Sequence, residues 1–160
     1  MDQSDFGEDP AASVTEVEFD RLVIRETEHW IWQVHENQSF LGRSILRLTR
    51  PLTLSLVHCS PDEWLSLRAE LTLYERFIHS LWAPDRFNYG QLGNVFHQLH
   101  VHAVPRYRAE RTWRGISFLD HRWGHNWAPT PASPLSVEQS YELAEWLRGE
   151  LRGFEEEHRC

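Results

Sequence analysis

The clearest alternation of polar and apolar positions along the chain lies in residues 96–106. Gln98, His100 and His102 occupy every second position there, and the residues between them are apolar. Because successive side chains of a β-strand point to opposite faces, this spacing predicts a strand with one apolar and one polar face. Pro105 cannot donate a ladder hydrogen bond, so the strand is predicted to end there or to lie at an edge.

Three further segments show the composition of strands. Residues 30–35 and 44–49 alternate in polarity and are separated by turn-forming residues 36–39, which predicts a hairpin. Residues 87–89 predict a short strand, and residues 90–94 predict a glycine-containing loop that leads into the histidine strand. That loop is placed to hold a ligand.

Two capping boxes predict the starts of two helices. Ser60-Pro61-Asp62-Glu63 predicts a helix over residues 60–81, and Ser136-Val137-Glu138-Gln139 predicts a second one over about residues 136–153. The first helix carries apolar residues at three- and four-residue steps, which we expect to cover the sheet: Trp64, Leu67, Leu71, Tyr74, Ile78 and Leu81. Strands that alternate irregularly with two helices indicate an α+β fold with an antiparallel sheet.

The tryptophans outside the helices fall into two groups. Trp30 and Trp32 lie in an alternating strand, where large aromatic residues are usually core. Residues 107–134 contain Trp113, Trp123 and Trp127 among Gly, Pro, His and Arg without a sustained period, which predicts an ordered loop. This loop is expected either to cover the site or to present a surface to a partner.

Composition and charge narrow the class of protein. The chain has 160 residues, 41% of them hydrophobic, which fits one globular domain over residues 16–160. Residues 1–15 are acidic with few apolar anchors and predict a disordered tail. The net charge of -8 argues against binding nucleic acid, and the absence of a long apolar stretch argues against a membrane span. Two distant cysteines predict no disulfide framework, so we expect a cytoplasmic protein.

Three interpretations of His100 and His102 follow from the residues. In the first interpretation the histidines are exposed on the strand and have no function. Three polar residues in register between apolar neighbours, Gln98, His100 and His102, make this interpretation the least favoured. Two histidines on one strand face could bind a metal ion if His121 or His125 supplied a third ligand. A neutral imidazole could also attack phosphorus, with the preceding loop donating hydrogen bonds to the phosphoryl oxygens.

Gln98-Leu99-His100-Val101-His102-Ala103-Val104-Pro105-Arg106 resembles the signature of the histidine-triad (HIT) superfamily, His-x-His-x-His followed by apolar residues and often Pro-Arg. Residues 88–95 resemble the loop before that signature in bacterial HIT proteins of the diadenosine-polyphosphate hydrolase type, and residues 37–43 resemble their nucleotide-side hairpin. The resemblance implies a HIT-like domain, with an antiparallel sheet of about five strands, two main helices and the histidine motif at 98–104.

The resemblance also implies a nucleotide hydrolase or transferase. It would cleave a phosphoanhydride or phosphoramidate of a nucleotide, such as a dinucleoside polyphosphate, through a nucleotidyl-histidine intermediate. His100 corresponds to the nucleophile and His102 to a phosphate contact. The other residues that the resemblance places near the nucleotide or its phosphates are Asn88, Gly93 and Asn94, with His35 or Asn37 in the ribose-binding turn.

The chain departs from the signature at Gln98, which stands where the family has its first histidine. Glutamine donates and accepts hydrogen bonds but does not carry a proton at neutral pH. The alternative is therefore a catalytically weak nucleotide-binding module of the same fold. Arg43 and Arg106 could reach phosphates, although surface arginines are usually solvated or paired. No cofactor or protein-bound metal is expected, Mg²⁺ can accompany the nucleotide, and the family resemblance predicts a homodimer.

Overall fold

The sheet of the protein is antiparallel and has five strands in the order β1-β2-β3-β5-β4. The computed structural model describes residues 17–158, so the tail expected at residues 1–15 lies outside the described residues. The strands are β1 (Val23–Glu26), β2 (Trp30–Val34), β3 (Ser44–Leu48), β4 (Arg86–Gly90) and β5 (His100–Arg106). The expected α+β class, with an antiparallel sheet of five strands and two main helices, is confirmed.

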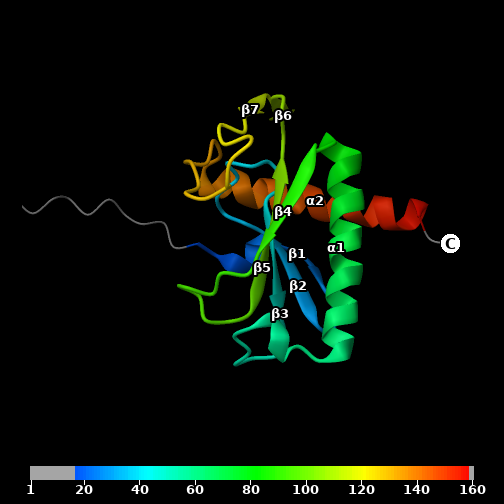
Figure 1. Cartoon of the computed structure of the whole chain (residues 1–160). Helices are drawn as coiled ribbons and strands as arrows, with labels where there is room; N and C mark the ends of the chain where they lie inside the picture. The colour runs from blue at the N-terminus through cyan, green and yellow to red at the C-terminus, as the bar shows by residue number, and fades with distance from the viewer. Residues whose placement is uncertain (1–16, 159–160) are drawn as a thin grey trace, which may run out of the picture.

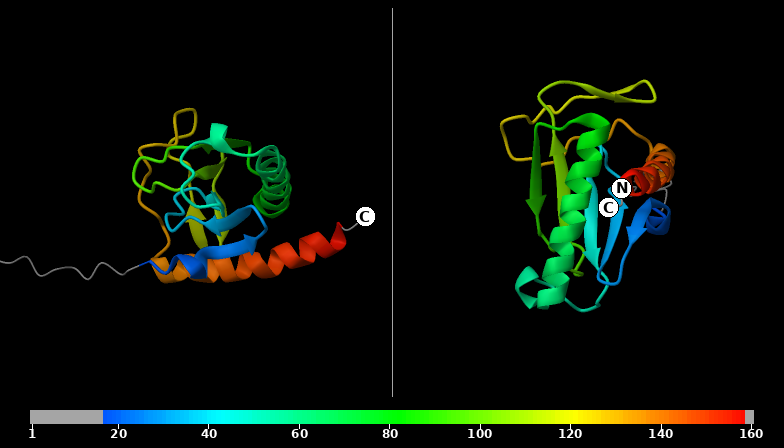
Figure 2. Two further views of the ribbon diagram at one scale, coloured as in Figure 1. Left: turned by 90° about the horizontal axis from the view of Figure 1, so that it is seen from below. Right: turned by 90° about the vertical axis from the view of Figure 1, so that its right-hand side faces the viewer.

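Two long helices pack on one face of this sheet. They are α1 (Pro61–Trp82) and α2 (Val137–Glu157), and each begins with the expected capping box. Figure 1 shows α1 along one side of the sheet, with the loop of residues 91–99 on the other side. In the left view of Figure 2, α2 lies along β1 at the sheet edge. One sheet face is thus covered by helices and the other is left for a site.

Register across the strands separates the two faces. Trp32, Leu46 and Val101 are opposite one another on β2, β3 and β5, and all three are buried in the core beneath the helices. The next row places Ile45 opposite His102, so these side chains point to the uncovered face. The predicted alternation of the histidine strand is therefore correct from His100 onward.

The buried face of α1 differs in part from the predicted stripe. Leu67, Tyr74 and Ile78 are buried as expected, but Trp64 is 44% exposed. The helix is rotated so that acidic residues share the buried face, which is lined by Glu63, Leu67, Glu70, Tyr74, Phe77, Ile78 and Trp82. Glu63 and Glu70 can be buried because Arg50 and Arg25 pair with their carboxylates.

Three other elements differ from the sequence predictions. The first strand, β1, was not predicted, and a hairpin of β6 (Arg111–Trp113) and β7 (Ile116–Phe118) interrupts the predicted loop. Arg114 and Gly115 both have positive φ, 47° and 78°, as a tight two-residue hairpin turn requires. The last helix continues to Glu157 because Phe154 packs on Phe77 and Glu155 pairs with Arg25. Two short 3₁₀ helices, Phe19–Leu22 and Leu56–His58, complete the elements of the described residues.

Among residues 17–158, no helix combines the length and apolar composition that a membrane span requires. The connections that matter for the uncovered face are residues 91–99, which enter β5, and residues 119–134, which pass beside β4 and β5.

Candidate active site

A cavity of about 690 Å³ lies on the uncovered face of the sheet. Its walls come from the strands β2, β3 and β5, from the loop of residues 91–99 and from the first 3₁₀ helix. The residues that line it are Phe19, Gln33, His35, Glu36, Ile45, Arg47, Leu92, Gly93, Asn94, Val95, Phe96, His100 and His102. Four of the predicted site residues, His100, His102, Gly93 and Asn94, are therefore brought together.

His100 begins β5 and is 6% exposed. Its Nδ1 lies 2.7 Å from the backbone carbonyl oxygen of Gln98. Because a carbonyl only accepts hydrogen bonds, Nδ1 carries the proton and donates it, which leaves the lone pair on Nε2. One imidazole nitrogen is thus held by the backbone while the other is available for nucleophilic attack.

His102 is packed between three rings. Its centroid lies 4.9 Å from that of His100, 5.8 Å from that of His35 and 5.5 Å from that of Trp127. Its Nδ1 is buried and has no hydrogen-bond partner in the described part of the chain. Burial, together with the charges of His100 and Arg43, lowers the pKa of His102 to about 4. The ring is therefore neutral at physiological pH.

Arg43 places a positive charge near the imidazole rings of His35 and His102. Its guanidinium lies 5.4 Å from the Trp127 ring, and the residue is only 4% exposed. Burial lowers the pKa of Arg43 itself to about 10. Arg43 does not line the cavity, so its effect is on the imidazoles, because its charge opposes protonation of His35 and His102.

We expect His102 to make the fold sensitive to acid. An unfolded imidazole titrates near pH 6.5, so between pH 6.5 and 4 the unfolded chain binds a proton that the folded chain excludes. Lowering the pH through this window should reduce the free energy of unfolding, by about 2 kcal/mol at pH 5 from this residue alone, with no contribution above pH 6.5. Urea unfolding at pH 7, 6 and 5 measures the slope.

The His102→Gln variant should remove about half of this slope, because burial also lowers the pKa of His35, to about 2, and that residue keeps its own contribution. His79→Gln, at an exposed site on α1, should leave the slope unchanged. An equal slope in the wild type and in His102→Gln would contradict the expectation.

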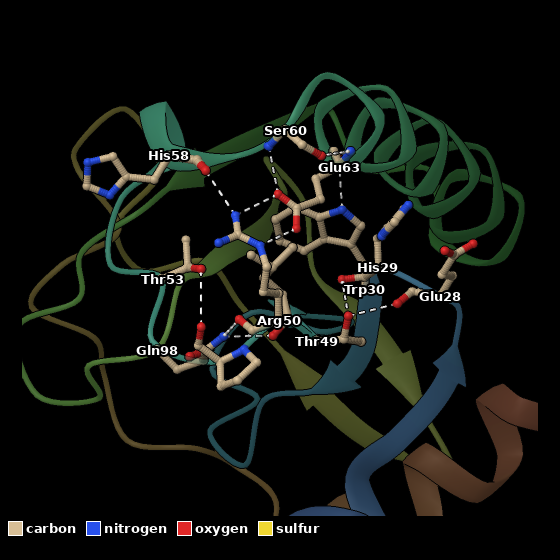
Figure 3. A network of polar contacts seen from close by, with 12 residues as sticks. Glu28, His29, Trp30, Thr49, Arg50, Thr53, His58, Ser60, Glu63 and Gln98 are labelled. Atoms are coloured by element: carbon tan, nitrogen blue, oxygen red, sulfur yellow. Dashed lines mark hydrogen bonds and ion pairs between the residues drawn. The ribbon is translucent and has the colours of Figure 1, made fainter.

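Gln98 does not reach the cavity, although the sequence placed it on the same strand face as His100. The chain bends before β5, and the Gln98 amide donates hydrogen bonds to the carbonyl oxygens of Leu48 and Arg50, at 2.9 and 2.7 Å (Figure 3). The prediction of one strand face shared by Gln98, His100 and His102 is therefore wrong. The physical reason is that two carbonyl oxygens at the end of β3 accept hydrogen bonds from this side chain, and regular pairing between β3 and β5 begins only at His100.

The same end of β3 is fixed to the start of α1. Arg50 donates to both carboxylate oxygens of Glu63, at 2.7 and 2.8 Å, and the Ser60 backbone N–H donates to Glu63 at 2.7 Å (Figure 3). These hydrogen bonds, mainly those from Arg50, lower the pKa of Glu63 to about 2. Gln98 thus attaches the segment that enters β5 to a capped helix start.

Asn88 and Asn37 do not line the cavity. The Asn88 side-chain oxygen accepts a hydrogen bond from Arg106 at 2.8 Å, and Asn37 donates to the Pro131 carbonyl at 2.9 Å. Of the two residues that the sequence offered in the ribose-binding turn, His35 and Asn37, only His35 lines the cavity.

The long loop after β5 is held by a buried ion pair. Arg106 donates to both carboxylate oxygens of Asp120, at 2.7 and 3.2 Å, and also to the backbone carbonyls of Arg122 and His125. Arg106 is thus a structural residue rather than a phosphate contact. The loop continues to Trp127, whose ring packs on His102, so of the two alternatives that the sequence leaves open for this loop, Trp127 favours a cover over the site.

The interpretation of His100 and His102 as metal ligands finds no third ligand among the described residues. No group of three or more His, Cys, Asp or Glu side chains in residues 17–158 is arranged to hold a metal ion. His121 and His125, which could have supplied a third ligand, do not line the cavity. Sequence reasoning missed Arg47, Gln33 and Phe19, because their place at the cavity depends on which strands pair.

Comparisons with known proteins bear on the fold. A histidine-triad protein from Bradyrhizobium japonicum matches with a TM-score of 0.61 at 18% identity, over 81% of this chain and 89% of that chain. One from Marinobacter aquaeolei gives a TM-score of 0.62 at 20% identity, over 84% and 94%. The chain has the histidine-triad fold. No protein-family model and no curated protein matches the sequence.

The histidine-triad fold is also that of the diadenosine triphosphate hydrolase of Plasmodium falciparum, solved in complex with cyclomarin A. It matches with a TM-score of 0.58 at 15% identity, over 89% of this chain and 88% of that chain. At these identities the likeness establishes the fold alone, and the activity has to be argued from the cavity.

Proposed function

We propose that this protein is a nucleotide hydrolase or transferase of the diadenosine-polyphosphate hydrolase type. It cleaves a phosphoanhydride or phosphoramidate bond of a nucleotide through a nucleotidyl-histidine intermediate. The observation that carries this proposal is the hydrogen bond from Nδ1 of His100 to the Gln98 carbonyl, which in the neutral ring places the lone pair on Nε2, in a cavity large enough for a nucleotide. The histidine-triad fold supports it.

The reaction would proceed in two steps. The Nε2 lone pair of His100 forms a bond to phosphorus while the bond to the leaving group breaks, and the leaving group keeps that electron pair. When the leaving group is an amine, its nitrogen also takes up a proton from solvent and departs neutral. Water then attacks the same phosphorus, releases a proton to solvent and breaks the bond to Nε2, which restores the imidazole. We assign the contacts with the phosphoryl oxygens to three donors of the cavity lining, which are His102, Asn94 and the backbone N–H groups of the loop around Gly93.

In this mechanism Gln98 is a positioning residue. Its carbonyl orients His100, and its amide is held by two backbone carbonyls outside the cavity. That task requires N–H donors and no titrating group, so the replacement of an imidazole by glutamine is compatible with activity. The alternative, a nucleotide-binding module without catalysis, is based on the inability of Gln98 to carry a proton. That inability does not matter if Gln98 only positions His100.

The direct test is incubation with diadenosine tetraphosphate and with adenosine 5′-phosphoramidate. Released mononucleotide is measured by chromatography, and a covalent nucleotidyl adduct by intact mass. Turnover with a transient adduct supports the proposal, whereas binding without release supports the nucleotide-binding module. Mg²⁺ with the substrate, a homodimer and a cytoplasmic location remain predictions.

We expect the Gln98→Leu variant to lower kcat by about 10- to 100-fold with little change in KM, because a misplaced nucleophile slows the reaction more than it weakens binding. The rate of adduct formation should fall in parallel, and Gln98→His, which retains a donor, should recover part of kcat. Steady-state kinetics measure both constants.

The matched control is Thr72→Val, since the Thr72 hydroxyl also donates to a backbone carbonyl, that of Arg68, at an exposed position of α1 away from the cavity. Wild-type kcat in Gln98→Leu, or an equal loss in the Thr72→Val control, would contradict the positioning role.

A further inference from the structure

Arg47 is the only arginine among the described residues that line the cavity, and the chain contains no lysine. It lies on β3 directly opposite His100 of β5. Directly opposite residues of antiparallel strands have Cβ atoms about 4.5–5.5 Å apart on the same sheet face. The guanidinium group therefore extends from a point beside the nucleophile.

The hydrogen bonds of Arg47 are not used within the described part of the chain. The residue is half-buried, yet no hydrogen bond or ion pair joins its guanidinium to another described side chain or carbonyl. Two other arginines, Arg50 and Arg106, are paired with buried carboxylates. Arg43 is also without a partner among the described residues, but it does not line the cavity. A guanidinium carries five N–H donors and binds phosphate and carboxylate oxygens well. Its partner is expected to be a ligand anion.

The register also places Arg47 relative to the other polar groups. His102 is opposite Ile45, whereas His100 is opposite Arg47, so the two rows are two residues apart along the strands. This distance is about 6.6–6.8 Å. A phosphoryl group attacked by His100 can thus contact His102 on one side, while the next phosphate of the substrate contacts Arg47.

We propose that Arg47 forms an anion subsite beside His100 that holds the leaving group of the substrate, and that this leaving group is a phosphate rather than a neutral amine. The inference rests on the proposed function and selects within it, favouring dinucleoside polyphosphates over phosphoramidates. As the bond from phosphorus to the bridging oxygen breaks, the electron pair stays on the departing phosphate. Arg47 stabilises the charge that develops there.

The test compares two substrates in wild type, Arg47→Gln and a control, Arg86→Gln, which alters an exposed arginine of β4 away from the cavity. With diadenosine tetraphosphate, whose leaving group is anionic, Arg47→Gln should lower kcat/KM by about 10- to 100-fold, the scale of one charge-assisted contact. With adenosine 5′-phosphoramidate the change should be less than about 3-fold. Arg86→Gln should behave as wild type with both substrates.

Binding of inorganic pyrophosphate, measured by calorimetry, separates this inference from the proposed function. Pyrophosphate binding that is lost in Arg47→Gln and kept in Arg86→Gln supports the anion subsite. If the wild type cleaves neither substrate, the proposed hydrolase activity is rejected, but this support for the subsite is unaffected. Equal losses with both substrates, or pyrophosphate binding that does not depend on Arg47, would overturn the inference.

Discussion

The His100→Ala variant should lose turnover by about 10⁴-fold or more, the scale of removing a nucleophile, and should form no nucleotidyl adduct. No other imidazole can take its place. His102 has its Nδ1 buried, and His35 accepts the Asn37 backbone N–H at its own Nδ1, so neither ring is held as His100 is. Released mononucleotide and intact mass are the measurements.

Folding and nucleotide binding should survive this substitution. His100 lines the cavity rather than the core, so its removal enlarges an existing space. The matched control is His97→Ala, three residues earlier on the exposed loop, which should leave turnover unchanged. Turnover by His100→Ala close to that of the wild type would reject the covalent mechanism. If His100→Ala loses both folding and turnover, the same measurements are made on His100→Gln, whose side chain fills more of the space of the imidazole.

The Arg106→Met variant should lower the free energy of unfolding by about 3–5 kcal/mol, because it leaves the carboxylate of Asp120 buried without its partner. The two side chains are 5% and 1% exposed, and Arg106 also donates to the Asn88 side chain and to two carbonyls of the loop. Urea denaturation at neutral pH measures the loss. The loop that carries Trp127 should become mobile at the same time.

An exposed ion pair offers the control. Arg114 and Glu142 are 55% and 50% exposed, so Arg114→Met should cost less than about 1 kcal/mol. The double variant Arg106→Met with Asp120→Leu should recover part of the loss, since it removes both buried charges. A loss in Arg106→Met no larger than in Arg114→Met would show that the buried pair contributes little to stability.

Local patterns predicted much of the fold. Period-2 alternation located β2, β3 and the part of β5 from His100 onward, and capping boxes located the starts of both helices. These signals arise within a few residues of each other. They depend on backbone geometry and on side-chain direction, which the sequence records directly.

The remaining features depend on pairings between distant residues. Gln98 leaves the strand face because carbonyls of Leu48 and Arg50, about fifty residues earlier, bind its amide. Arg47 reaches the cavity only because β3 pairs with β5 in one register. Glu63 and Glu70 are buried on α1 because Arg50 and Arg25, which lie outside the helix, pair with their carboxylates. No spacing within the sequence encodes such contacts.

The hydrogen bonds that connect Gln98, Arg50 and Glu63 make the position of His100 depend on the stability of the first turn of α1. The Gln98 amide donates to the Arg50 carbonyl, and the Arg50 side chain donates to Glu63 of the α1 capping box (Figure 3). Opening of the first turn of α1 would therefore release the segment that orients His100, long before the sheet itself unfolds. Heat inactivation would then follow the opening of this turn, and amide hydrogen exchange in residues 60–64 and 98–100 would speed up together.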